Sequence, residues 1–206
     1  MSGLYSIKPW FVRRLRPRED ALVERGTSPD SLTIAAVVVS ATAGAAIAAG
    51  AIASRPVLWL LVPPLGLVRL ALNALDGAVA RRSGSVRPFG EVMNEIGDRL
   101  SDVALVAPLS FVTGPAPAFG ALTCALLASA AGSAGRSVAG ERAQGGPMGK
   151  ADRVAVVVVA AAAGAVSGST LPFHGAAAIV GAGSLVTMTV RLAGLSRRQA
   201  GADARR

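Results

Sequence analysis

The residues best suited to chemistry lie in one stretch, from Asn73 to Asp102, which reads NALDGAVARRSGSVRPFGEVMNEIGDRLSD. It is flanked by apolar runs of the kind that enter membranes. Ionisable side chains are costly in lipid, so they face a protein interior or a water-filled cavity and mark a functional site. Carboxylates can bind hard divalent cations or accept a proton, and arginines can pair with phosphates. This stretch is therefore the candidate site.

Helical spacing gathers its polar residues onto two faces. The face before the loop follows spacings of four, three and four residues and comprises Arg69, Asn73, Asp76 and Ala80. The face after the loop comprises Glu91, Asn94, Glu95, Asp98 and Asp102. Such stripes are prohibitively costly against lipid, so both are expected to point inward and toward each other. Arg81 lies one residue further round, where the first helix leaves the membrane.

The elements that position these faces are apolar segments of transmembrane length, roughly 20 residues each. The candidate spans are 31–53, 56–80, 90–113, 116–138, 151–168 and 173–194. A hydrophobic content of 52% with only 4% aromatic residues suits helices that pack through Ala and Gly. The predicted fold is an all-α integral membrane protein with six transmembrane helices. The predicted regions are a cytoplasmic amphipathic segment at 1–30, the membrane domain at 31–196 and a basic tail at 197–206.

Positive charges alternate between the ends of these spans. They cluster before span one, between spans two and three, between spans four and five, and after span six, whereas the opposite loops hold only Arg55. The positive-inside rule therefore places both termini and the candidate site in the cytoplasm. The net charge of +9 is explained by this topology and by attraction to anionic lipids. A nucleic-acid partner is not expected, because no soluble basic domain with a recognition motif is present.

The N-terminal segment interleaves arginines with apolar residues, which is typical of a helix on the membrane surface, although a solvated arm stays open. Pro9 and Pro17 predict that it is not one unbroken helix. No apolar run follows its basic residues closely, so no cleaved signal peptide is expected. Cys124, the single cysteine, excludes an internal disulfide and is expected to be a buried small hydrophobe.

The candidate stretch resembles the motif of the CDP-alcohol phosphotransferase family. That motif is Asp, two residues, Asp-Gly, two residues, Ala-Arg, about eight residues, Gly, three residues, Asp, three residues, Asp. The matching positions are Asn73, Asp76, Gly77, Ala80, Arg81, Gly90, Asn94 and Asp98. Every spacing fits, and Asn occupies two of the four acidic positions.

The resemblance implies that a phosphatidyl or other alcohol-phosphate group moves from a CDP-alcohol, first of all CDP-diacylglycerol, to an acceptor alcohol with release of CMP in phospholipid biosynthesis. It implies one or two Mg²⁺ or Mn²⁺ ions and a homodimer. The high content of Ala, Gly and Arg suits a high-GC bacterium, so the expected location is a bacterial plasma membrane. The metal positions would be Asn73, Asp76, Asn94 and Asp98, with Asp98 as ligand or general base. The nucleotide positions would be Gly77, Ala80, Arg81 and Gly90.

The two Asn residues weaken the implied metal site. Two Asp and two Asn leave about two positive charges of two divalent ions uncompensated, and an amide oxygen coordinates more weakly than a carboxylate. Glu91, Glu95 or Asp102 on the same face could restore the charge, or a single ion could bind. Asp102 lies one helical turn beyond Asp98, so its participation is geometrically open.

The sequence predicts the acceptor site less directly than the metal and nucleotide positions. Arg136, Lys150 and Arg153 are expected near the same cytoplasmic mouth, and GPMGKADR resembles a basic loop that holds an acceptor phosphate in the family. Ordinary positive-inside charge explains Lys150 and Arg142 equally well. The acceptor itself stays open among serine, glycerol phosphate and inositol phosphate. Two alternatives to an enzyme are a catalytically inactive relative that binds nucleotide lipid or partners another synthase, and a small transporter.

Overall fold

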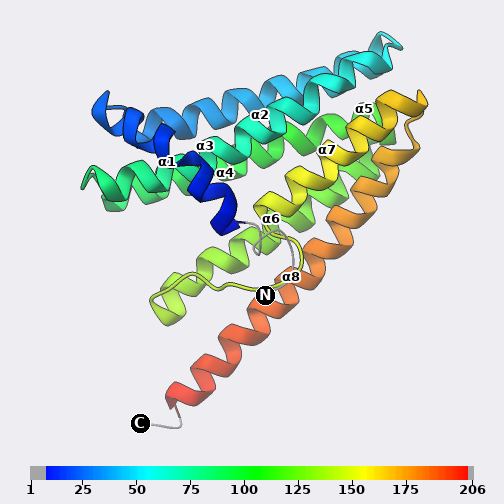
Figure 1. The fold of residues 1–206 in the computed structure, drawn as a ribbon. Coiled ribbons are helices and arrows are strands. Elements are labelled where there is room, and N and C mark those ends of the chain that lie inside the picture. Colours follow the sequence, from blue (N-terminus) through cyan, green and yellow to red (C-terminus); the bar gives the residue numbers. More distant parts are fainter. Residues whose placement is uncertain (1–7, 204–206) are drawn as a thin grey trace.

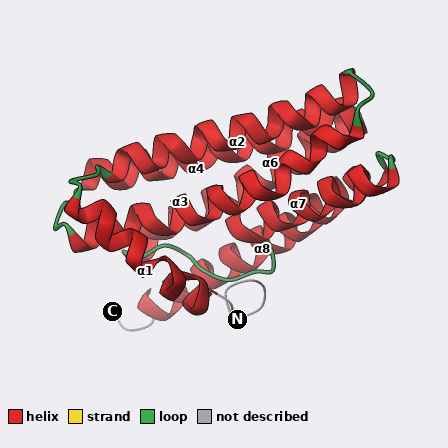
Figure 2. Cartoon of the chain, turned by 45° about the horizontal axis from the view of Figure 1, so that its top comes forward, coloured by secondary structure: helices red, strands yellow, loops and turns green. Residues whose placement is uncertain are grey.

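The computed structural model describes residues 8–203, and its regular elements are helices that run mostly lengthwise beside one another (Figure 1 and Figure 2). In chain order they are α1 (Lys8–Glu24), α2 (Pro29–Ile52), the 3-10 helix η2 (Pro56–Leu61), α3 (Val62–Arg82), α4 (Pro88–Val106), the 3-10 helix η3 (Ala107–Leu109), α5 (Ser110–Thr113), α6 (Pro115–Ala139), α7 (Lys150–Ser167) and α8 (Leu171–Asp203). The all-α prediction is confirmed for this part of the chain.

Four helical stretches within the described residues are long and apolar enough to cross a membrane. They are Pro29–Ile52, Pro56–Arg82, Pro115–Val138 and Leu171–Ala200. α4 and α7 fall short by composition, because α4 carries the acidic face and α7 begins with Lys150, Asp152 and Arg153. The last helix also continues to Asp203, into the segment expected as a separate tail.

Proline and glycine set the helix boundaries. Pro29 stands in the first turn of α2, where its missing N–H costs nothing. Pro63 and Pro64 stand in the first turn of α3, so they separate η2 from α3 rather than bend a continuous helix. Gly140 ends α6 in the left-handed region, at φ 70°, and opens the loop that leads to α7.

The main apolar core lies at one end of the bundle, away from the charged faces. Trp59 is 2% exposed and donates a hydrogen bond from Nε1 to the Ile47 carbonyl oxygen at 3.1 Å. Its ring meets Phe173 edge to face, with centroids 4.9 Å apart. This packing joins α2, η2 and α8 and stabilises the apolar end of the bundle.

Glycines bring α2 and α4 into close contact. A Cβ on Gly97 of α4 would collide with the Thr33 side chain, and a Cβ on Gly44 of α2 would collide with the Ala104 carbonyl oxygen. Small residues at such crossings are the usual means of close helix packing in membranes. They hold the glycine-bearing side of α4 directly against α2.

The N-terminal helix packs on α3. Leu15 is buried with Leu32, Leu75 and Val79, and Arg82 forms an ion pair with Asp20 at 2.7 Å. The prediction that Pro17 interrupts this segment is wrong, because α1 continues through it. Residues 1–7 and the side chains of residues 8–12 lie outside the described part, so the expected apolar side at Trp10 and Phe11 stays a prediction. Cys124 is half-buried on α6.

Candidate active site

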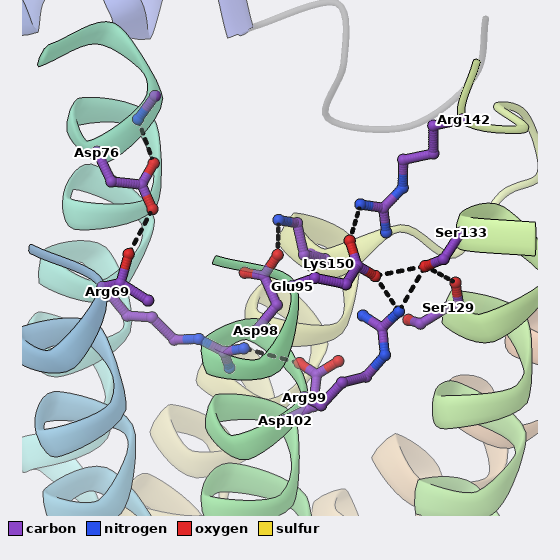
Figure 3. Close-up of polar contacts among 12 residues, drawn as sticks. Arg69, Asp76, Glu95, Asp98, Arg99, Asp102, Ser129, Ser133, Arg142 and Lys150 are labelled. Atoms are coloured by element: carbon purple, nitrogen blue, oxygen red, sulfur yellow. Dashed lines mark hydrogen bonds and ion pairs between the residues drawn. The ribbon is translucent and has the colours of Figure 1, made fainter. Parts of the chain in front are cut away.

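The acidic faces of α3 and α4 point inward, as expected. Asp76 is 5% exposed, Asp98 is 3% exposed and Asp102 is fully buried. Figure 3 shows Asp76 on one helix and Asp98 and Asp102 on its neighbour, with cationic side chains reaching in from other parts of the chain. Buried charges of this kind need partners, and the partners differ for each carboxylate.

Asp76 has neutral hydrogen-bond partners. Its own helix supplies the Gly77 N–H, which donates to Oδ1, and α2 supplies the Thr33 hydroxyl, which donates to Oδ2 at 3.5 Å. The carboxylate also lines a large cavity. Asp76 is therefore held in place without being neutralised by a direct ion pair, which suits a group that must meet a cation.

Asp98 forms an ion pair with Lys150, the first residue of α7. The Lys150 side chain is 34% exposed, whereas that of Asp98 is 2% exposed. The loop before α7 is anchored on both sides: Met148 N–H donates to the Thr187 hydroxyl at 2.8 Å, and Gly149 N–H donates to Asp152 at 2.9 Å. These contacts fix the loop and aim the ammonium at Asp98.

Asp102 has one arginine on each oxygen. Arg69 Nη2 donates to Oδ1 at 2.7 Å, and Arg153 Nη2 donates to Oδ2 at 2.6 Å. Arg153 also donates to the Ser129 hydroxyl at 3.0 Å. Both arginines are 1% exposed. This arrangement leaves Asp102 poorly placed to replace a missing metal ligand.

The two glutamates considered as replacement ligands are also paired with arginines. Glu95 accepts from Arg99, from Ser133 and from Arg142, the last at 2.6 Å, while Glu91 pairs with Arg136. Their carboxylates therefore link α4 to α6 and to the loop that follows α6. Metal binding by either glutamate stays a prediction.

The larger cavity has a volume of about 840 Å³, within the usual range for small-molecule sites. It is lined by six of the motif residues, Asp76, Gly77, Ala80, Arg81, Gly90 and Asn94. Asn73 is half-buried on α3, and neither it nor Asp98 lines this cavity. Arg136 also lines this cavity. It is thus separated from Lys150 and Arg153, which line a different pocket and with which it was expected to hold an acceptor phosphate.

A second, smaller pocket of about 230 Å³ is strongly basic. It is lined by Ser129, Arg142, Ala143, Gln144, Lys150, Arg153 and Arg191. Lys150 and Arg153 were expected near an acceptor; Arg191 of α8 was not. Its guanidinium donates to the carbonyl oxygens of Ala128, at 2.6 Å, and Gly145, at 3.2 Å. The sequence does hold a signal for Arg191, because it is a charged residue inside the apolar run 173–194. Charged residues inside spans two and three were taken as functional for the same reason.

The motif positions offer oxygen donors of two kinds. The motif positions supply two carboxylates, Asp76 and Asp98, and the neutral amides of Asn73 and Asn94. Lys150 already balances part of the carboxylate charge. Within residues 8–203 there is no group of three or more His, Cys, Asp or Glu side chains that could hold a metal ion.

No protein-family model matches the chain. Among curated proteins, it is 35% identical to the inner membrane protein YnbA of Escherichia coli over 155 residues, which cover 74% of this chain and 76% of that protein. It is 30% identical to the phosphatidylinositol phosphate synthase of Mycobacteroides abscessus over 200 residues, or 93% and 87% of the two chains. It is 29% identical to the archaetidylinositol phosphate synthase of Aeropyrum pernix over 117 residues, or 54% of each chain.

Solved structures give the same fold. The phosphatidylinositol phosphate synthase PgsA1 of Mycobacterium tuberculosis with CDP-DAG bound superposes with a TM-score of 0.69 at 20% identity, covering 89% of this chain and 94% of that one. The same enzyme in complex with manganese and citrate gives a TM-score of 0.63 at 21% identity, covering 87% of each chain. The motif spacing, the fold and the full-length relative agree: the chain belongs to the CDP-alcohol phosphotransferase family of integral membrane enzymes.

Proposed function

We propose that this chain transfers the phosphatidyl group of CDP-diacylglycerol to a hydroxyl of a phosphorylated polyol and releases CMP. The observation that carries the proposal is the placement of the two motif carboxylates. Asp76 lines the large cavity, and Asp98 pairs with Lys150, which lines the small basic pocket. A donor in the large cavity and a phosphorylated acceptor in the basic pocket would meet at these carboxylates. The names of the relatives support inositol phosphate as the acceptor.

In the proposed reaction, an acceptor hydroxyl oxygen forms a bond to the β-phosphorus of the donor. The bond from that phosphorus to the bridging oxygen breaks, and its electron pair leaves with CMP. The acceptor proton passes to Asp98, whose buried position removes competing water from the proton transfer. Lys150 is exposed enough to leave Asp98 and follow the acceptor phosphate, which would free the carboxylate for this role.

Asp76, Asp98 and the amide oxygens of Asn73 and Asn94 are the residues proposed to hold a divalent cation, Mg²⁺ or Mn²⁺. When bound, such a cation neutralises the pyrophosphate and stabilises the leaving CMP. We propose one ion, because two carboxylates, of which Asp98 is already paired with Lys150, cannot balance two. The manganese complex of a family member supports the choice of metal class.

The donor headgroup is proposed to lie along α3 in the large cavity. A Cβ on Gly77 would come within 3.2 Å of Arg81 Nη1, so the absence of a side chain lets the guanidinium fold back along the helix. Arg81 is exposed and can pair with a donor phosphate. Gly90 and Ala80 line the same cavity and leave room for a nucleotide.

The acceptor phosphate is proposed to lie in the small pocket, where Arg142, Lys150, Arg153 and Arg191 converge. Guanidinium groups recognise phosphate through paired, directional hydrogen bonds. Arg136 is left out of this assignment, because it pairs with Glu91 in the other cavity.

The proposed membrane arrangement keeps six spans, with α4 and α7 crossing beside the more apolar helices and exposing apolar side chains such as Leu100 and Val159. Both termini and the candidate site would face the cytoplasm, since the basic residues gather at that end. A homodimer stays part of the proposal through the family resemblance. Reporter fusions to each loop, and the mass of the protein in detergent, test these two points.

The experiment is CMP release from CDP-diacylglycerol by the purified protein in liposomes with Mg²⁺ or Mn²⁺. The acceptors are inositol 1-phosphate and glycerol 3-phosphate, with free inositol and serine as matched acceptors that lack a phosphate. Release that requires a phosphorylated acceptor is the expected result. Release with free inositol or serine alone would contradict the basic pocket as the acceptor site.

A catalytically inactive relative is the second candidate, favoured by one observation: Asn73 and Asn94 stand where the family motif has Asp. It would bind CDP-diacylglycerol in a metal-dependent way and release no CMP with any acceptor. The same liposome assay, combined with donor binding measured on the same preparation, separates the two.

A further inference from the structure

Three buried charges, Arg69, Asp102 and Arg153, form a connected row below the candidate active site, and we call them the Arg-Asp-Arg triad. Asp102 lies one turn beyond Asp98 on α4, Arg153 one turn beyond Lys150 on α7, and Arg69 on the inward face of α3. Their side chains are 1%, 0% and 1% exposed, in chain order. Figure 3 shows the contact between Arg69 and Asp102.

Burying the triad costs desolvation free energy, and some of its hydrogen-bond donors have no partner. Two guanidiniums share one carboxylate, so the group carries a net positive charge in a protein interior. Arg69 Nε and Nη1 and Arg153 Nε have no hydrogen-bond partner. Apolar residues of similar volume would stabilise this part of the protein equally well. The desolvation cost of burying three charges therefore points to a functional role for the triad.

The two arginines differ in what they reach. Arg153 lines the small basic pocket, whereas Arg69 lines neither cavity. Arg153 Nη2 is held by two acceptors on two helices, Asp102 at 2.6 Å and Ser129 at 3.0 Å. Asp102 is held in turn by Arg69 at 2.7 Å. The orientation of the pocket arginine is therefore set by Ser129 inside the pocket and by Asp102, which lines neither cavity.

We infer that Asp102 is a positioning residue for the acceptor: it fixes the Arg153 guanidinium in the basic pocket, and Arg69 fixes Asp102. The inference rests on the proposed function, because it takes that pocket as the site of the acceptor phosphate. Phosphate recognition by a guanidinium depends on direction as well as charge. Without Asp102, the Arg153 guanidinium keeps its charge but is no longer held in one orientation. The affinity for the acceptor is therefore expected to fall, while the affinity for the donor stays the same.

The test compares Asp102→Asn, Arg153→Gln and the double variant. Each single variant is expected to raise the KM for inositol 1-phosphate about tenfold while the KM for CDP-diacylglycerol stays within about twofold. The double variant is expected to be no worse than Arg153→Gln alone, since Asp102 acts through Arg153. Multiplied effects, or an equal rise in both KM values, would overturn the inference in favour of general structural damage.

Asp102→Asn leaves two guanidiniums without an anion and can prevent folding, so a charge-balanced variant is needed. Arg69→Gln/Asp102→Asn removes one charge of each sign, keeps the net charge of the triad and still releases Arg153. It is expected to show the same acceptor defect. Glu141→Gln, at an exposed ion pair with Arg198, is the matched control and is expected to behave as wild type.

Inorganic phosphate binding, measured by calorimetry on the same proteins, separates this inference from the proposed function. Phosphate binding that weakens about tenfold in the charge-balanced variant supports the positioning role even if no acceptor is turned over. A wild-type enzyme that uses phosphorylated acceptors, with an unchanged acceptor KM in the charge-balanced variant, would leave the proposed function standing and refute the role of Asp102.

Discussion

Lys150 and Asp98 form an ion pair across 52 residues of sequence, and the pair joins the first turn of α7 to the acidic face of α4. One partner lines the basic pocket and the other is the proposed base. The charge that holds Asp98 in the free protein is therefore also available to an acceptor phosphate. Acceptor binding and release of the base would be one event.

Lys150→Met is expected to lower kcat/KM for a phosphorylated acceptor about 100-fold, because the acceptor loses a cation and Asp98 loses its partner. Lys150→Arg, which keeps the charge with a different shape, is expected to recover part of that loss. Steady-state CMP release at varied acceptor concentration measures both. A defect confined to the KM for CDP-diacylglycerol would contradict the assignment.

Asp98→Asn and Asp76→Asn are each expected to lower CMP release by 100-fold or more, about the range for loss of a general base or a metal ligand. The two variants should differ in donor binding. Asp76 lines the donor cavity, so Asp76→Asn is expected to weaken metal-dependent binding of CDP-diacylglycerol more than Asp98→Asn does. Equal donor affinity in both variants would argue against separate roles.

Local spacing predicted the central pair of this site, because Asp76 and Asp98 are fixed by helical periodicity and by a motif with many positions. The partners of Glu95 and Asp102 were predictable only in part. Arg99 lies one turn beyond Glu95 on α4, so spacing alone allows that pair. The other arginines that pair with these carboxylates come from α3, α7 and the loop after α6. Which distant cation reaches which carboxylate depends on how the helices pack.

Composition alone also limited the prediction of spans. The apolar stretches that contain α2, α3, α6 and α8 are identifiable as spans because their charges are few. α4 and α7 are proposed spans that hydropathy alone does not identify, because both carry several charged residues. Some of these charges pair with each other, as Asp98 with Lys150 and Asp102 with Arg153.

The charge at the motif predicts one divalent ion per chain. Titration of Mn²⁺ into the donor-bound protein, followed by electron paramagnetic resonance, is expected to give one bound ion in wild type. Asn73→Asp/Asn94→Asp restores two carboxylates and is expected to raise the count to two or to tighten the affinity about tenfold, since carboxylates bind such ions better than amides. Two ions in wild type would show that substrate oxygens replace the missing charge.

Gly44→Ala is expected to destabilise the protein because the added methyl group meets backbone. The new Cβ would collide with the Ala104 carbonyl oxygen, so α2 must move away from α4, at a cost of about 1–3 kcal/mol. Gly120→Ala is the matched control: it makes the same change in α6, where a Cβ meets nothing within 4 Å. It is expected to be neutral or stabilising by up to ~1 kcal/mol, from helix propensity alone.

Thermal unfolding in detergent measures the difference between these two variants. Because α4 carries Asp98 and Asp102, Gly44→Ala is also expected to lower activity in proportion to the displacement of that helix, whereas Gly120→Ala should leave it unchanged. Equal melting temperatures for the two variants would mean that α2 and α4 do not meet at Gly44 in the membrane. That result would also remove the packing contact that holds α4 against α2.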